Sequence, residues 1–116
     1  MSQKAATESY KEIRTRVRNI LADYAKRKKT VTYSGLVWEA GLPFDAYSTA
    51  MNELLCDIST SEHGFGRPML SALVVGKDGG IPGSGFYKAA KALGYDASDQ
   101  LSFWADQVSR TFSTSW

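Results

Sequence analysis

The fold is decided by residues 31–58, VTYSGLVWEAGLPFDAYSTAMNELLCDI. At the start of this stretch Val31 and Tyr33 alternate with threonines, which predicts a short extended segment. Residues 34–40 are expected to form a short helix. Gly41 ends that helix because glycine readily adopts the left-handed backbone found at helix ends.

A second helix is expected after Pro43, with Asp45 as its N-cap. Its apolar positions share one face at helical spacing: Tyr47, Ala50, Met51, Leu54, Leu55 and Ile58. Two short helices joined by residues 41–44 give the outline of a helix-turn-helix.

A long helix precedes this region and is expected from about Thr7 to about Lys28. Its core face carries apolar residues at a period of three to four: Tyr10, Ile13, Val17, Ile20, Leu21 and Tyr24. After the middle region, residues 59–66 are expected to be a loop and residues 68–75 a buried strand. Residues 77–80 read as a turn.

Two more helices are expected towards the end of the chain. One covers residues 86–93 and stops at Gly94, and the other is capped by Ser98 or Asp99. The apolar face of the last helix carries Leu101, Trp104, Ala105, Val108 and Phe112, with Trp116 on the same stripe. The sequence therefore predicts one α+β domain over residues 1–116. This domain is winged-helix-like, with a long N-terminal helix, a short sheet and a C-terminal helix.

Composition restricts the class of protein further. The chain has 116 residues, of which 43% are hydrophobic and 22% charged, as in ordinary globular domains. Its one cysteine, Cys56, has no partner for an internal disulfide, so a reducing, cytoplasmic compartment is expected. No signal-peptide pattern or membrane-spanning run is present in the sequence, and membrane partners are not expected.

Charge is unevenly distributed along the chain. Residues 1–30 carry nine Lys or Arg against three acidic residues, whereas residues 31–116 carry five against nine. A basic arm on a mildly acidic body favours an acidic partner for the arm, and a solvated helix and turn is the alternative interpretation.

The middle of the chain resembles the DNA-binding domain of the O6-alkylguanine-DNA alkyltransferases and of their catalytically inactive alkyltransferase-like relatives. The matching residues span roughly 31–94: Val31 to Leu36, Gly41 to Pro43, Ala50, Met51, Pro68, Val74 to Gly76, Asp78, Gly79, Gly83 and Lys88 to Leu93. The resemblance implies a winged-helix-like fold and a DNA-binding role.

The same comparison excludes the alkyl-transfer reaction. Pro68 is followed by Met69 where that family has its active-site cysteine, and the accompanying histidine and arginine are also missing. Without a thiolate there is no alkyl acceptor, and Cys56 lies in a predicted helix. The arginine that the family inserts into the base stack falls near Tyr47, on the predicted core face. The exposed side of that second helix shows two carboxylates and no basic residue, a poor surface for phosphate: Asp45, Ser48, Thr49, Asn52 and Glu53.

The leading functional hypothesis is a non-catalytic module that binds nucleic acid through its basic arm. Its expected contacts are Lys26, Arg27, Lys28, Lys29, Thr32, Tyr33, Ser34, Ser48 and Asn52. The second hypothesis is a protein-interaction or inhibitor module whose partner is anchored by Trp38, Phe65 and Phe103.

A third hypothesis is a small enzyme. Glu62, His63, Arg67 and Ser71 combine acid, imidazole, guanidinium and hydroxyl groups, with His63 as general base and Arg67 as anion clamp. A Glu62–Arg67 salt bridge beside an exposed histidine is the structural interpretation, and it is preferred. We therefore expect no enzyme, and we expect no cofactor or metal because one histidine and one cysteine do not make a zinc site.

Overall fold

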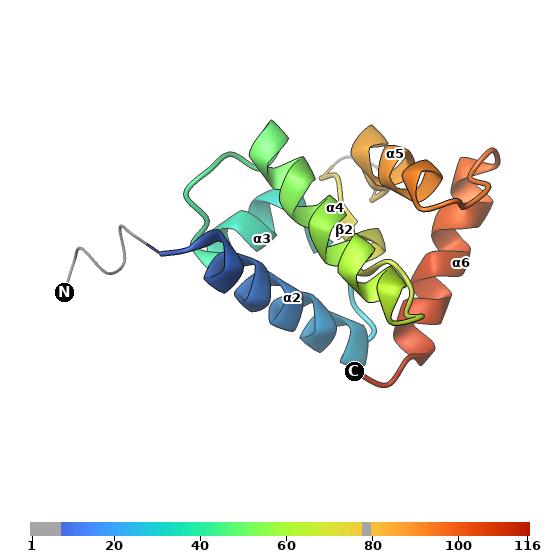
Figure 1. Ribbon diagram of the computed structural model, residues 1–116, viewed down its shortest axis with the longest axis horizontal. Coiled ribbons are helices and arrows are strands. Elements are labelled where there is room, and N and C mark those ends of the chain that lie inside the picture. Colours follow the sequence, from blue (N-terminus) through green and yellow to red (C-terminus); the bar gives the residue numbers. More distant parts are fainter. Residues whose placement is uncertain (1–7, 78–79) are drawn as a thin grey trace.

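The computed structural model describes residues 8–77 and 80–116, and Figure 1 shows how their elements pack. In chain order the elements are α2 (Tyr10–Lys26), β1 (Val31–Thr32), α3 (Tyr33–Ala40), α4 (Thr49–Gly64), the 3-10 turn η1 (Leu70–Leu73), β2 (Val74–Val75), α5 (Ser84–Ala92) and α6 (Gln100–Ser113). This arrangement confirms an α+β domain that is mostly helical with a small sheet.

Helix α2 begins one residue after Ser9, which caps it together with Glu12 in a reciprocal capping box. The expected start at Thr7 lies outside the described residues. Val17 and Leu21 are fully buried on the predicted face. Tyr10 was expected in the core and is instead 45% exposed, because it lies in the first turn at the edge of the packed surface.

The sheet consists of two short parallel strands in the register Val31 with Val74 and Thr32 with Val75. The predicted extended segment at residues 30–33 is thus confirmed at its centre. The chain then turns directly into α3, where the Thr32 hydroxyl accepts a hydrogen bond from the Gly35 amide at 3.0 Å. Gly41 ends α3 in the left-handed conformation, as predicted.

Helix α4 departs from the prediction at both ends. Ser48 caps it, rather than Asp45, by accepting a hydrogen bond from the Met51 amide at 3.2 Å. Tyr47 therefore precedes the helix and is 66% exposed instead of facing the core. At the other end the helix continues to Gly64, through the stretch predicted as a loop. Residues 59–66 were predicted as a loop because they are mostly polar. Two of these polar side chains, Ser59 and Glu62, are in fact buried on the core face of the helix.

The stretch predicted as a buried strand is buried, but most of it is not a strand. Residues Leu70 to Leu73 form a 3-10 turn, and only Val74 and Val75 pair with β1. Leu70, Leu73 and Val74 are completely buried against α2 and α4. An apolar run of this length is compatible with either conformation, so burial was predictable and backbone type was not.

Helix α5 lies on the side of α4 away from α2, and α6 runs along the edge of the molecule so that its last turns reach α2 (Figure 1). Asp99 caps α6, one of the two expected residues. The face that α6 buries carries polar residues as well: Gln107 is 2% exposed and Thr111 is fully buried, whereas the predicted Leu101 is 65% exposed. The Gln107 side chain accepts the Met69 amide at 3.0 Å, which explains why an amide side chain occupies this position.

The helices have no membrane-spanning character within the described ranges, since none combines the required length with sufficient apolarity. Across the same residues, no three His, Cys, Asp or Glu side chains are grouped so as to hold a metal ion.

Candidate nucleic-acid interface

The basic turn comprises Lys26, Arg27, Lys28 and Lys29, and it closes the end of α2. All four side chains are exposed. The Lys29 amide donates to the Tyr24 carbonyl oxygen at 3.0 Å and the Lys28 amide donates to the Ala25 carbonyl oxygen at 3.0 Å. These bonds form the cap that commonly ends a helix, so the four cations stand on a defined backbone.

Lys28 occupies the position in this cap at which glycine is preferred. Its φ is 55°, and among the described residues it is the only non-glycine with a positive φ. For a residue with a Cβ the left-handed conformation costs roughly 1–2 kcal/mol. The turn therefore has a lysine where glycine would be less strained, and a strained residue of this kind marks a candidate functional position.

Contacts among side chains join the basic turn to α3. Arg27 donates to Asp23 at 2.9 Å, and its guanidinium lies 4.4 Å from the centre of the Tyr24 ring. The Tyr24 hydroxyl in turn donates to Glu39 at 2.6 Å. That hydrogen bond, with burial as a smaller cause, raises the pKa of Tyr24 and keeps the phenol protonated. The other three cations of the turn form no ion pair with any described residue.

The predicted hydroxyl contacts beside the turn are mostly engaged within the fold. Thr32 caps α3, and Tyr33 is 5% exposed with its hydroxyl accepting the Gly83 amide at 2.8 Å. Burial is the main cause that raises the pKa of Tyr33. Ser34 alone of the three is an exposed side chain. Thr32 and Tyr33 thus position the start of α3, and only Ser34 remains open to a ligand.

The structure does not bring Ser48 and Asn52 to the basic turn. Helices α2 and α4 run in the same direction (Figure 1), with Tyr10 bonded to Asp57 and Arg18 bonded to Glu62. At 1.5 Å per residue the turn lies about 24 Å beyond Tyr10, and Ser48 lies about 13 Å from Asp57 in the opposite direction. The start of α4 and the basic turn are therefore at opposite ends of the α2–α4 pair.

The two amide and hydroxyl residues at the start of α4 have local structural roles. Ser48 caps the helix. Asn52 lies against α5, where a Cβ on Gly85 would come within 2.8 Å of its side-chain oxygen. The predicted interface is therefore reduced to the basic turn and the adjoining α3.

The predicted polar cluster of Glu62, His63, Arg67 and Ser71 is built around a buried carboxylate that pairs with two arginines. Glu62 is 3% exposed, and its Oε1 accepts bonds from Arg67 at 2.7 Å and Arg18 at 3.2 Å. Burial alone would raise the pKa of Glu62, but the bonds from the two arginines outweigh it and lower that pKa. Both guanidinium groups also lie over the ring of Trp116, at 5.5 Å for Arg18 and 6.0 Å for Arg67. This network attaches the end of the chain to α2 and α4.

The remaining residues of that cluster do not form a catalytic arrangement. His63 lies 3.3 Å from the Tyr95 hydroxyl. Ser71 is 4% exposed and its hydroxyl is 2.6 Å from that of Ser59. His63 and Arg67 do line a common hollow of about 470 Å³, whose lining does not include Ser71. The imidazole and the predicted nucleophile are thus engaged with different partners.

The predicted partner-binding aromatics differ in exposure. Trp38 is 87% exposed on α3 and Phe65 is 72% exposed at the end of α4. Phe103 is not a surface anchor, because it packs 5.7 Å from Phe86 and 5.3 Å from Tyr95, measured between ring centres. Phe103 was expected to anchor a protein partner, but α5 and the loop after it cover that side of α6.

Sequence reasoning missed Tyr24 and Glu39 as parts of the candidate site. Tyr24 was assigned only to the core face, and it is in fact half-buried with its hydroxyl directed to α3. Its place two residues before the basic turn was the available signal. The spacing gave no indication of Glu39, since the pair joins two separate helices.

Comparison with known proteins adds no family to this description: no protein-family model, no curated protein and no solved structure matches the chain.

Proposed function

We propose that this domain binds the phosphate backbone of nucleic acid through the basic turn, without catalysing a reaction. The observation that carries the proposal is Lys28, a charged residue held at φ 55° among four consecutive exposed cations. A glycine there would relieve the strain but would remove a charge from the centre of the turn. A lysine in this strained position is explained if its positive charge binds a phosphate group.

The charge of the turn favours an anionic ligand. Asp23 engages Arg27, while Lys26, Lys28 and Lys29 are exposed and pair with no acidic side chain among the described residues. Lysines that replace the counterions of phosphates give an attraction that is independent of base sequence and depends strongly on salt. The proposed activity is accordingly non-specific binding.

The winged-helix comparison supports this proposal only in its outline. The order of an extended segment, a helix and a second helix is present, and the sheet is small. Docking by the start of α4 is disfavoured, because Asp45 and Glu53 are exposed there and the basic turn is at the far end. We therefore assign the contact surface to the basic turn and not to α4.

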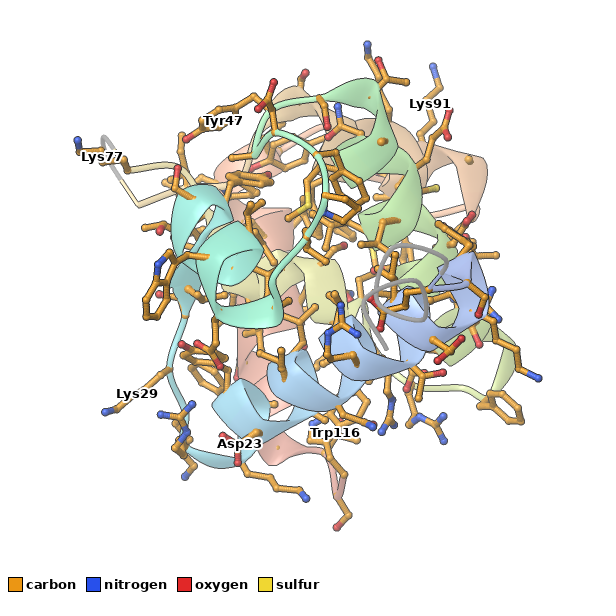
Figure 2. All side chains as sticks on the ribbon, turned by 90° about the vertical axis from the view of Figure 1, so that its left-hand side faces the viewer. Asp23, Lys29, Tyr47, Lys77, Lys91 and Trp116 are labelled. Carbon is orange, nitrogen blue, oxygen red and sulfur yellow. The ribbon has the colours of Figure 1, made fainter. Side chains whose placement is uncertain are left out.

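Two matched variants test this assignment. One replaces the turn lysines, as Lys26→Gln, Lys28→Gln and Lys29→Gln, and leaves Arg27 with Asp23. The other removes the same charge elsewhere, as Lys77→Gln, Lys88→Gln and Lys91→Gln, all exposed. In the end-on view of Figure 2, Lys29 and Lys91 project from opposite flanks.

The readout is fluorescence anisotropy of a labelled oligonucleotide at about 50 mM salt, where phosphate contacts are strong. The turn variant is expected to bind about tenfold more weakly, and the control variant within about twofold of the unmodified protein. A larger loss in the control variant would relocate the interface to α5. Absence of binding by the unmodified protein would reject the proposal.

A protein-interaction role is the second candidate, and the exposure of Trp38 and Phe65 favours it. The two side chains stand on separate elements, Trp38 in α3 and Phe65 directly after the last residue of α4. If the protein binds no nucleic acid, these aromatics become the first positions to substitute in a search for a protein partner.

A further inference from the structure

Trp38 is the most exposed of the large hydrophobic side chains in the described residues, at 87%. It stands on a helix with defined ends, capped by Thr32 and closed by Gly41. The other two tryptophans are held in the fold, since Trp104 donates to the Ala72 carbonyl oxygen at 2.8 Å and Trp116 to that of Thr111 at 2.8 Å. An indole left open on a rigid support is available to a ligand.

Trp38 lies close to the basic turn. Its neighbour Glu39 accepts the Tyr24 hydroxyl at 2.6 Å, and Arg27 covers the Tyr24 ring at 4.4 Å. The connecting chain sets an upper limit on the separation: three extended residues from Lys29 to Thr32 span about 10 Å, and six helical residues to Trp38 span about 9 Å. The two features are therefore within about 20 Å, a distance that a short single-stranded segment can span.

Cations that follow a phosphate backbone, combined with an aromatic ring, are the means by which proteins hold single strands without sequence preference. A duplex offers its phosphates to the lysines but keeps its bases stacked inside. An unpaired strand offers both its phosphates and its bases.

We infer that the preferred ligand is a single-stranded nucleic acid, with its phosphates on Lys26, Lys28 and Lys29 and one base stacked on Trp38. This inference rests on the proposed function and names its substrate class. Charge complementarity favours a nucleic acid as the ligand of Trp38, because the neighbouring lysines attract a polyanion.

The nearby carboxylates are both engaged in contacts. Asp23 bonds Arg27 at 2.9 Å, and Glu39 accepts the Tyr24 hydroxyl. Both remain exposed and negatively charged, so they weaken the attraction to phosphate without closing the surface. Stacking on Trp38 adds an attraction that these carboxylates do not oppose.

The test compares a single strand of about ten nucleotides with its duplex, a length within the range that one small domain covers. The probes are labelled oligothymidine and the matching duplex, measured by anisotropy, together with the tryptophan emission of the protein. Two variants are compared, Trp38→Leu and Tyr47→Leu. Tyr47 is a matched control because it is 66% exposed and lies well apart from Lys29 in Figure 2, with its ring packed on that of Tyr33 at 5.3 Å between centres.

The unmodified protein is expected to bind the single strand at least about fivefold more tightly than the duplex, with quenched tryptophan emission. Trp38→Leu should lose both that preference and the quenching, whereas Tyr47→Leu should keep both. Equal affinity for the two probes, with Trp38→Leu unchanged, overturns this inference and leaves the proposed phosphate binding intact. No binding of either probe overturns both and leaves Trp38 to a protein partner.

Discussion

The backbone amide of Lys29 donates to the carbonyl oxygen of Tyr24 at 3.0 Å, and this bond closes the end of α2 around Lys28. The bond requires Lys28 to adopt a φ of 55°, a region that favours glycine. The hydrogen bond that closes the helix end therefore also holds Lys28 in a strained backbone conformation, which lowers the stability of the folded protein.

Lys28→Gly is expected to make the protein more stable and its binding weaker. Glycine relieves the left-handed strain but gains freedom in the unfolded chain, so the free energy of unfolding should rise by about 0.5–1 kcal/mol. The loss of one phosphate contact should weaken oligonucleotide binding. Urea denaturation and anisotropy on the same preparation measure the two effects. Stability and affinity moving in the same direction would contradict a functional reason for Lys28.

Glu39→Gln is expected to strengthen binding. The substitution removes a negative charge next to Trp38 and keeps a carbonyl oxygen that accepts from Tyr24, so the link between α2 and α3 persists. Removing one exposed like charge is worth about 0.2–1 kcal/mol, or about a factor of 1.4 to 5 in affinity at low salt. Glu53→Gln, on the exposed side of α4, is the control and should change affinity little. An equal gain from both would show a general charge effect.

Glu62→Gln is expected to lower the stability of the fold. The variant leaves Arg18 and Arg67 without their buried carboxylate, and breaking a buried pair costs about 3–5 kcal/mol. Both arginine side chains are about one-third exposed, so we expect about 1–3 kcal/mol. Asp106→Asn is the control, because its pair with Arg110 is exposed and should cost less than about 1 kcal/mol. Similar losses in the two variants would show that the Glu62 network is not a special support.

The same carboxylate predicts sensitivity to acid. The pKa of Glu62 is lowered from its ordinary value of 4.5 in the folded state, so the native protein releases this proton more readily than the unfolded chain. The resulting stabilisation is complete above the unfolded pKa and is lost as pH falls through the folded pKa. Urea midpoints between about pH 6 and about pH 3 should fall more steeply for the unmodified protein than for Glu62→Gln. Parallel curves would assign the acid sensitivity to other groups.

Helical periodicity predicted the buried face of a helix where apolar residues recur every three or four positions. It failed where the buried side chains are polar. The core face of α2 from Ile13 to Leu21 was predicted because each apolar position recurs at three or four residues. The Glu62–Arg67 ion pair was predicted and is present. The burial of Glu62 in α4 and of Gln107 in α6 was not predicted, because a carboxylate paired with arginines, or an amide bonded to Met69, leaves no apolar signal in the sequence.

The candidate site was predictable in its charge but not in its shape. Four consecutive cations are visible in any reading of the chain. Their distance from Ser48 and Asn52 depends on α2 and α4 running in the same direction, which is a tertiary property. The strain at Lys28 follows from the cap formed with Tyr24, a position at which glycine is generally preferred, and the lysine there gave no sign of such a cap.

The most direct test of the central claim is the salt dependence of oligonucleotide binding by the unmodified protein and by the Lys26→Gln, Lys28→Gln, Lys29→Gln variant. The logarithm of the binding constant should fall linearly with the logarithm of salt concentration, by about 0.7 per phosphate contact on a single strand. Removing three contacts should reduce the slope by about 2. A slope that is unchanged in the variant, or an affinity of the unmodified protein that does not respond to salt, would contradict phosphate binding by the basic turn.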